Sequence, residues 1–362
     1  MANVNVKVMM FGGRRCGKTS VLAAMQSCFE KVFGRSNLTI SAADEDTLFT
    51  IEEKNREIKG YFHNQGRSRE FTPDSNPTLE IMEYRFNIGL KNKTDKNKTG
   101  DGIVVDFIDY PGEWLADREK VKKIMPLIKQ CHVIIIAIDS PHLMEQTHSD
   151  EEDAVGEFND ARNYSYRIGE WVKREFSAES DLSAKMILFV PLKCEKYYHH
   201  RQMAMLNKKV KKAYATTLNF FENNGQSYEV AITPILTCGA EDKGVEFSRF
   251  ARDDEGEIIL DPKFHTPQKA IYIFTERMVE PKPLYCEQPM IYVLAYVLEM
   301  VRKRKQDERD ADGILGSIWR SIQEKFFNLP SAKDFARERD NIKKAMKKTD
   351  NGYEIVNNPL NF

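Results

Sequence analysis

A short segment near the start of the sequence constrains the fold more than any other. Residues 4–25 read as an apolar strand, a glycine-rich turn and the start of a helix. The turn runs from Gly12 to Thr19 and matches the phosphate-binding pattern G-x-x-x-x-G-K-[ST], the P-loop. In such a loop, backbone N–H groups surround phosphate oxygens, and the helix that follows directs its positive dipole end at the same anion. The segment predicts a nucleoside phosphate site; the alternative is an ordinary glycine-rich turn between a strand and a helix.

This loop supplies the predicted phosphate contacts and one metal ligand. Lys18 is the expected catalytic cation at the outer phosphates, and the Thr19 hydroxyl is an expected Mg²⁺ ligand. One of the two arginines inside the loop could reach the phosphates as an arginine finger, but we favour the alternative that both face solvent or a partner. The expected nucleotide contacts of the loop are Gly12, Gly13, Arg14, Arg15, Cys16, Gly17, Lys18, Thr19 and Ser20.

Composition narrows the class of protein. The 362 residues carry a net charge of −1, which predicts no nucleic-acid partner. The six cysteines form no CxxC pair and one lies inside the P-loop, which favours a reducing compartment. The sequence starts with no signal-peptide pattern, and its longest apolar run, residues 133–138, is too short to span a bilayer. We therefore expect a cytoplasmic protein without an integral membrane segment; peripheral membrane contact stays open.

The middle of the chain alternates between apolar strands and amphipathic helices. This alternation predicts an α/β fold: a three-layer sandwich in which helices cover both faces of a six-stranded, mostly parallel sheet. Two of the strands are joined by a short polar loop, which predicts one antiparallel strand. The strands after the first are expected at residues 78–90, 103–110, 132–139, 185–192 and 230–236, and the helices at residues 19–32, 44–63, 160–176, 201–223 and 289–304.

Three segments interrupt or follow this pattern. We expect a core domain over residues 1–305, with insertions at about 35–77 and 241–285. The second insertion contains β-like pieces at residues 257–260 and 270–274, which predict a hairpin. Residues 306–362 are expected to form a helical extension that docks on the core through an amphipathic segment, with Leu315, Ile318, Trp319, Ile322 and Phe326 on its apolar side.

Two further motifs resemble loops of the Ras-like GTPases. The strand at 103–110 ends in D-x-x-G, Asp109 to Gly112. In GTPases this aspartate holds a water ligand of Mg²⁺, and the glycine N–H senses the γ-phosphate. The resemblance also implies a switch threonine that closes on Mg²⁺ at the start of the preceding strand. Thr78 is the candidate, with Thr72 as the runner-up and an ordinary strand-start threonine as the alternative.

Two later segments resemble the loops that recognise guanine. The strand at 185–192 leads into Leu192-Lys193-Cys194-Glu195, where GTPases usually carry [NT]-K-x-D. Lys193 matches, and Glu195 keeps the carboxylate that accepts hydrogen bonds from the guanine base. After the last predicted strand, Gly239 and Ala240 resemble the loop whose backbone N–H binds the guanine oxygen.

Together these motifs follow the order of the five GTPase loops, so the chain resembles P-loop GTPases of the TRAFAC/Ras-like class. Residues 109–114 and 192–197 resemble the bacterial double-GTPase (DO-GTPase) and YcjX-like families. The resemblance implies a Ras-like fold, GTP or GDP with Mg²⁺, metal coordination through Thr19, Thr78 and Asp109, and a protein effector or activator.

The residue that orients the attacking water usually follows D-x-x-G, and here it is Glu113. A glutamate can hold a water, but its charge repels the γ-phosphate unless it is paired. We therefore expect Glu113 and Thr78 to act with Lys18 in slow hydrolysis of GTP. Two alternatives remain: a nucleotide-binding interaction protein with little turnover, and an ATPase.

Overall fold

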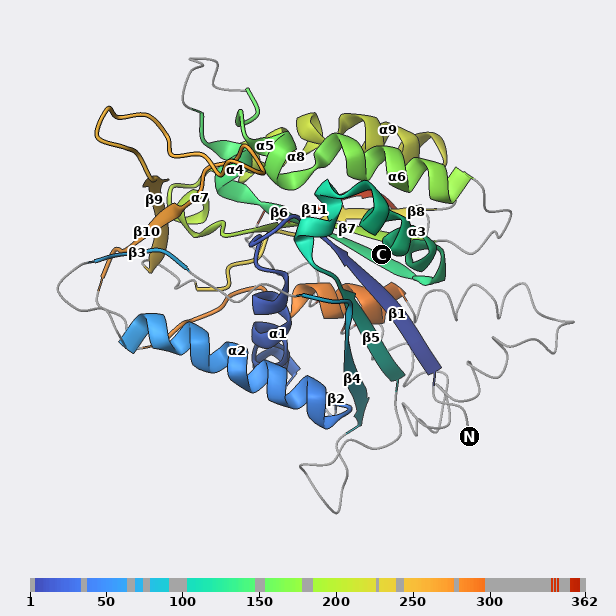
Figure 1. Cartoon of the computed structure of the whole chain (residues 1–362). Helices are drawn as coiled ribbons and strands as arrows, with labels where there is room; N and C mark the ends of the chain where they lie inside the picture. Colours follow the sequence, from blue (N-terminus) through green and yellow to red (C-terminus); the bar gives the residue numbers. More distant parts are fainter. Residues whose placement is uncertain are drawn as a thin grey trace, which may run out of the picture.

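The computed structural model describes residues 4–33, 38–63, 69–73, 79–90, 103–146, 154–177, 185–225, 228–238, 244–276, 280–296, 340, 342, 344 and 352–358. Helices cover both faces of a central sheet, so the predicted α/β fold is confirmed (Figure 1). Its centre is five mutually parallel strands, and their order in space is β8-β7-β6-β1-β5. The strands are β1 (Val4–Phe11), β5 (Ile103–Asp109), β6 (Val133–Asp139), β7 (Lys185–Leu192) and β8 (Tyr228–Ile232).

The predicted number of strands was too low. The expected antiparallel neighbour is β4 (Met82–Leu90), which pairs with β5. Two more antiparallel strands lie at the edges, β2 (Leu38–Ala42) beside β4 and β11 (Glu354–Asn357) beside β8, so the described sheet has eight strands rather than six. β2 lies in the segment that was expected to be an insertion, and β11 adds a strand to the segment that was expected to be a helical extension.

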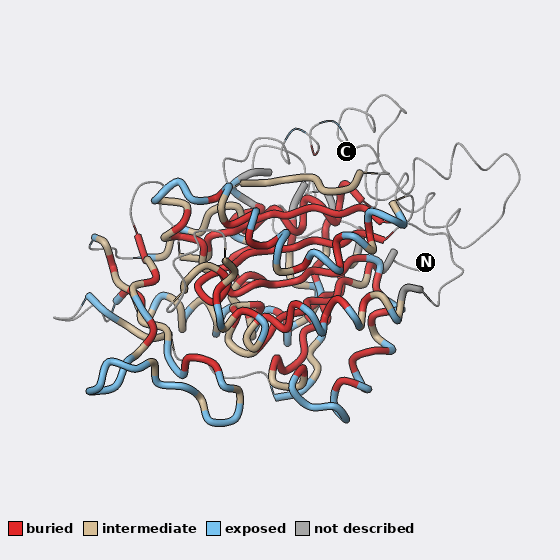
Figure 2. Tube along the Cα trace, turned by 90° about the horizontal axis from the view of Figure 1, so that it is seen from above, coloured by how far each residue is buried: buried red, intermediate tan, exposed pale blue. Residues whose placement is uncertain are grey.

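The two helical layers follow from side-chain alternation along the buried strands. In β6, Val133 and Ile135 point to one apolar core, whereas Ile134 and Ile136 point to the other. The first core holds α1 (Lys18–Phe33), α2 (Glu45–His63) and a helix at residues 288–296. The second holds α3 (Arg118–Gln130), α6 (Ser165–Ser177), α8 (Met203–Ala213) and α9 (Ala215–Asn223). β6, β7 and β8 are buried along their length, and much of the sheet's centre is buried (Figure 2).

Two expected helices are each divided in the structure. The helix expected at 160–176 is α5 (Asn159–Asn163) followed by α6, because Tyr164 adopts a left-handed conformation with φ 51° between them. The helix expected at 201–223 divides into α8 and α9 at Tyr214. Short helical segments fill the connections: the 3₁₀ helix η1 (Gly112–Ala116), α4 (Ser140–Met144) and α7 (Glu195–His199).

A second, three-stranded sheet replaces the expected hairpin. β9 (Val245–Phe250) pairs with β10 (Ala270–Phe274), and β10 also pairs with β3 (Glu70–Phe71) from the first insertion. The piece expected at 257–260 is no strand and makes only isolated bridges. The sheet packs with α2 around a third apolar core, formed by Phe62, Val245, Phe247, Phe250, Tyr272 and Phe274. β3 of the first insertion and the strands of the second insertion therefore form one structural unit beside the main sheet (Figure 1).

Candidate functional site

The P-loop joins β1 to α1 at the carboxyl edge of the parallel strands. Lys18 is only 7% exposed, and its Nζ donates to Gly12 O at 3.1 Å across the loop. Gly17 has a φ of 108°, a backbone conformation that favours glycine. The loop therefore curls around the lysine, as the sequence motif predicts.

Another glycine is required by a neighbouring helix. A Cβ added to Gly13 would collide with the carbonyl oxygen of Arg162 on α5. α5 thus lies directly against the phosphate loop and brings the Arg162 side chain to the site.

The D-x-x-G segment meets the same loop from β5. Asp109 is fully buried, and its Oδ2 accepts a hydrogen bond from Thr19 Oγ1 at 3.1 Å. Its other oxygen lies 3.6 Å from Lys18 Nζ and accepts no hydrogen bond from the described residues. A Cβ on Gly112 would collide with the backbone of Gly13 and Arg14, so the two loops touch. The structure brings together Lys18, Thr19, Asp109 and Gly112.

The arrangement of oxygens fits Mg²⁺. A hydroxyl and a carboxylate are the hard oxygen ligands that Mg²⁺ prefers, and Mg²⁺ usually completes its shell with water and phosphate oxygens. The described residues contain no group of three or more His, Cys, Asp or Glu side chains suited to a metal. Thr19 and Asp109, whose oxygens lie 3.1 Å apart, would hold the ion together with phosphate and water oxygens.

Arg14 pairs with carboxylates of this chain, contrary to our expectation that both arginines of the loop face solvent or a partner. Its Nε lies 3.0 Å from Glu113 Oε1, and its Nη1 lies 3.2 Å from Asp261 Oδ2. The guanidinium also lies over the Phe264 ring, 5.3 Å from the centroid. Glu113 is therefore paired, which meets the condition under which a glutamate is tolerable beside a phosphate.

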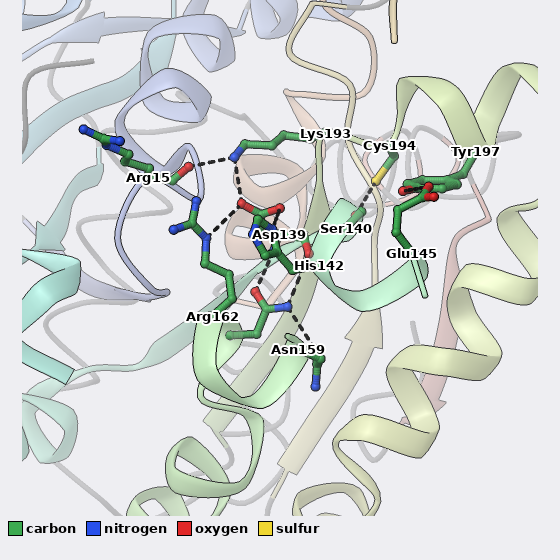
Figure 3. Close-up of polar contacts among 11 residues, drawn as sticks. Arg15, Asp139, Ser140, His142, Glu145, Asn159, Arg162, Lys193, Cys194 and Tyr197 are labelled. Carbon is green, nitrogen blue, oxygen red and sulfur yellow. Dashed lines mark hydrogen bonds and ion pairs between the residues drawn. The ribbon is translucent and has the colours of Figure 1, made fainter. Parts of the chain in front are cut away.

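The predicted base loop contacts the P-loop through Lys193. This residue has a left-handed φ of 58°. Its Nζ donates to Arg15 O and to Asp139 Oδ2, each at 2.7 Å (Figure 3). Asp139 ends β6, so one ammonium group joins the P-loop, the base loop and the central sheet.

Asp139 is the centre of a buried charge cluster that sequence reasoning missed. Its carboxylate also contacts His142 Nδ1 at 2.8 Å and Arg162 Nε at 3.3 Å (Figure 3). Burial raises the pKa of Asp139, but His142, Lys193 and Arg162 together hold it well below its usual range. Burial lowers the pKa of His142 to about 4, so at neutral pH Lys193 and Arg162 are the cations that balance Asp139.

One signal in the sequence could have identified Asp139. It is a carboxylate directly after the apolar run 133–138, at the edge of the sheet where the P-loop also lies. Functional groups of open parallel sheets gather at that edge. Arg162 carries no such signal, because its place depends on how α5 packs against Gly13.

Glu195 lies where the base loop turns into α7. It is 4% exposed, and its Oε1 accepts a hydrogen bond from Cys238 N at 2.9 Å. Burial raises the pKa of this carboxyl above its usual value, although the Cys238 N–H bond acts in the opposite direction. The contact joins the Lys193–Glu195 loop to the segment after β8, the two places predicted to read the base.

A cavity of about 120 Å³ opens beside these loops. One wall comes from the P-loop and the predicted base loops, including Arg15, Gly17, Ser20, Leu192, Lys193, Glu195 and Cys238. Other lining residues come from α2, from the second sheet and from segments that flank its strands, including Glu57, Ile58, Tyr61, Phe71, Thr72, Lys269 and Tyr272. The runner-up Thr72 therefore lines this cavity. Thr78, Gly239 and Ala240 lie outside the described residues, as do the five apolar residues predicted for the tail helix.

No helix in the described part of the chain is both long and apolar enough to cross a membrane. No curated protein matches the sequence. Two solved structures of the GTPase-like domain of S. cerevisiae Ski7 are similar, one bound to GTP and one bound to GDP and inorganic phosphate. Each has 11% sequence identity and a TM-score of 0.34, and each match covers 65% of this chain and 43% of the Ski7 chain. The present chain thus spans less than half the length of these structures.

A family model gives the stronger result. The model of Double-GTPase 2 matches residues 7–222, more than half of the chain. The matched region begins in β1 and ends in α9, so it includes the P-loop, the D-x-x-G segment and the Lys193–Glu195 loop. The structure brings the phosphate loop, Asp109 and Glu195 of this matched region to one edge of the sheet. Because the family model covers more than half of the chain, the chain belongs to the Double-GTPase 2 family.

Proposed function

We propose that the protein binds GTP with Mg²⁺ and hydrolyses it slowly to GDP and phosphate, acting as a regulatory switch. The observation that carries the proposal is the contact between three loops at one edge of the sheet. Asp109 lies within hydrogen-bond distance of Thr19 and within ion-pair distance of Lys18. Lys193 connects the P-loop to the predicted base loop. Family membership supports guanine-nucleotide binding.

The chain's own residues account for binding and orientation. Lys18 would exchange its hydrogen bond to Gly12 O for the outer phosphates, because an ammonium prefers an anionic acceptor. Thr19 and Asp109 would hold Mg²⁺, which when bound neutralises charge on the phosphates. Gly112, already against the P-loop, would present its N–H to the γ-phosphate, and Glu113 would orient the attacking water.

Base recognition is assigned to Lys193 and Glu195. The carboxylate of Glu195 can accept from the two donors that guanine presents on one edge, whereas adenine offers no such pair there. The raised pKa of Glu195 reflects burial, and a pair of donors favours its ionised form. The cavity beside both residues provides space bounded by Leu192 and Tyr61.

The alternative is a nucleotide-binding interaction protein with little turnover, with an ATPase as a further candidate. A glutamate in place of glutamine after D-x-x-G favours low turnover. The Arg14–Glu113 ion pair favours hydrolysis, because it neutralises the charge that would oppose GTP.

Two measurements test the proposal. Titration of the purified protein with GTP, GDP and ATP, with and without Mg²⁺, should give a guanine preference, and Lys18→Ala should weaken the binding of all three nucleotides. Single-turnover release of γ-phosphate should then be slow but faster than in Glu113→Ala. Equal or tighter binding of ATP would contradict the GTPase assignment. Guanine binding without phosphate release above that of Lys18→Ala would favour the interaction protein.

A further inference from the structure

The second insertion reaches the P-loop through a single arginine. Arg14 lies between two carboxylates from distant parts of the sequence, Glu113 after the D-x-x-G motif and Asp261 between β9 and β10. Only 26% of the Arg14 side chain is exposed, compared with 36% for Glu113 and 21% for Asp261. The contact is therefore partly shielded from water, which strengthens it relative to an exposed ion pair.

We propose that Arg14 is a positioning residue for GTP hydrolysis: it neutralises Glu113, and the Asp261 loop (residues 251–269) holds its guanidinium in place. This inference rests on the proposed function. It gives the insertion a part in the chemistry, although the insertion supplies no residue to the Lys18–Thr19–Asp109 cluster.

The need for a neutralising cation follows from the position of Glu113. It directly follows Gly112, whose backbone touches the P-loop at Gly13 and Arg14. An unpaired carboxylate there would repel the γ-phosphate and the attacking water's developing negative charge. Arg14 is the cation that lies within ion-pair distance of Glu113 in the part of the chain that the structure describes. The pair leaves the carboxylate able to orient a water through its remaining lone pairs.

The Asp261 loop is built to hold the other end of the guanidinium. Asp261 Oδ1 accepts from the backbone N–H groups of Lys263 and Phe264 at 2.9 and 3.1 Å, which leaves Oδ2 for Arg14. The backbone of Asp261 donates to Thr266 O at 2.8 Å, and Thr266 is buried. Phe264 supplies the ring face under the guanidinium. These contacts fix the position of the acceptor before Arg14 binds it.

The same geometry argues against two other roles for Arg14. An arginine finger would direct its guanidinium at phosphate, but here Nη1 donates to Asp261 Oδ2 and Nε lies 3.0 Å from Glu113 Oε1. If Arg14 only linked the P-loop to the Asp261 loop, it would need the contact with Asp261 but not the contact with Glu113. The role of a charge partner for Glu113 accounts for both contacts.

The test is a double-mutant cycle in the full chain. Single-turnover phosphate release and the ratio of GTP to GDP affinity are measured for the natural protein, Arg14→Ala, Glu113→Gln and the double variant. In the natural background, Arg14→Ala should lower the rate and the affinity ratio about tenfold, because it exposes the phosphate to an unpaired charge. In the Glu113→Gln background, where no charge needs a partner, the same change should cost less than about twofold.

Two further variants distinguish the role of the Asp261 loop in hydrolysis from a general loss of stability. Asp261→Asn should lower the rate by about threefold in the natural background and leave the affinity for GDP unchanged, since it weakens one of the two contacts of Arg14. Lys122→Ala, which removes an exposed pair with Glu119 on α3, is the matched control and should change neither quantity.

An equal fold-loss on Arg14→Ala in the natural and Glu113→Gln backgrounds would overturn the inference. Faster hydrolysis in Arg14→Ala would also overturn it, because the ion pair would then restrain Glu113. If the natural protein binds GTP but releases too little phosphate to measure, the affinity ratio decides. Absence of guanine-nucleotide binding by the natural protein would overturn the proposed function and this inference together, whereas additive costs would overturn this inference alone.

Discussion

A single ammonium group positions the predicted phosphate and base loops relative to each other. Lys193 Nζ donates to Arg15 O in the P-loop and to the buried carboxylate of Asp139. Its left-handed backbone costs energy for a residue with a Cβ, which indicates that the contact is worth maintaining. We infer that the site is preorganised, so that nucleotide binding does not first have to bring these loops together.

Glu195 should decide which base is bound. Glu195→Gln keeps the oxygen that accepts from Cys238 N but loses the negative charge that favours two base donors. We expect the affinity for GDP to fall about tenfold or more while the affinity for ADP changes little. Isothermal titration with both nucleotides measures this. Glu195→Asp keeps the charge and is the matched control; equal losses for GDP and ADP in Glu195→Gln would show that Glu195 acts on the fold and not on the base.

His142 should make the free energy of unfolding depend on pH. Burial lowers its pKa to about 4 in the folded protein, below the value of about 6.5 in an unfolded chain. Between these values the unfolded state binds the additional proton, so stability falls as the pH is lowered from about 6.5 to 4, by about 1.4 kcal/mol per pH unit, and is unaffected by this group above about 6.5.

The measurement compares two proteins. Urea unfolding of the natural protein and of His142→Gln should give curves whose difference in stability shrinks as the pH is lowered from about 7 to about 5. The raised pKa values of Glu195 and Glu287 oppose the effect, but they are present in both proteins and cancel in the difference. A constant difference would mean that His142 is not buried in its neutral form.

At the scale of the helices, α3 begins with a side-chain cap directly after η1. Asp117 accepts from the backbone N–H groups of Glu119 and Lys120 at 3.0 and 3.2 Å. Asp117→Ala should therefore lower the free energy of unfolding by about 1 kcal/mol, and Asp117→Asn, which can also cap, by much less. Denaturant unfolding measures both; equal losses would show that the cap hydrogen bonds contribute little.

The sequence predicted regular elements well where their pattern was local. The P-loop segment and the apolar strands were expected close to where they lie. α3 was missed although Val121, Ile124, Met125 and Ile128 are buried at helical spacing, and Pro126 lies inside it, where proline is normally unfavourable. The division between α5 and α6 was missed too, because nothing in the local pattern predicts a left-handed Tyr164.

At the scale of the whole molecule, the errors concern pairings between segments that are distant in sequence. β3 pairs with β10 across about two hundred residues, and β11 joins β8 from the far end of the chain. The same is true of the site. Lys18, Asp109 and Glu195 follow known motifs, whereas Arg162 and Asp261 reach the site only through tertiary packing. A motif identifies the chemistry of the site, but the partners that tune it come from the fold.

The second sheet is held against the base loop by specific contacts. His199 Nδ1 on α7 lies 2.8 Å from Glu246 Oε1 on β9, and the Lys196 ammonium lies over the Phe247 ring. α7 begins at Glu195, so the base loop and the second sheet share a helix. The cavity between them is lined from both sides. A nucleotide base in this cavity would contact the main sheet's loops and the second sheet at once.

Nucleotide binding should therefore protect backbone amides from hydrogen exchange both in the loops of the main sheet and in the second sheet. In hydrogen-exchange measurements, GDP with Mg²⁺ should slow exchange in the P-loop and also in α2 near Tyr61 and in β10 near Tyr272. A ligand that contacts both sides of the cavity binds only when both are folded, so it suppresses local unfolding of both. Lys18→Ala, incubated with the same nucleotide, should show neither effect. If protection appears in the P-loop but not in α2 and β10, the base does not occupy the cavity, and the second sheet has a role separate from nucleotide binding.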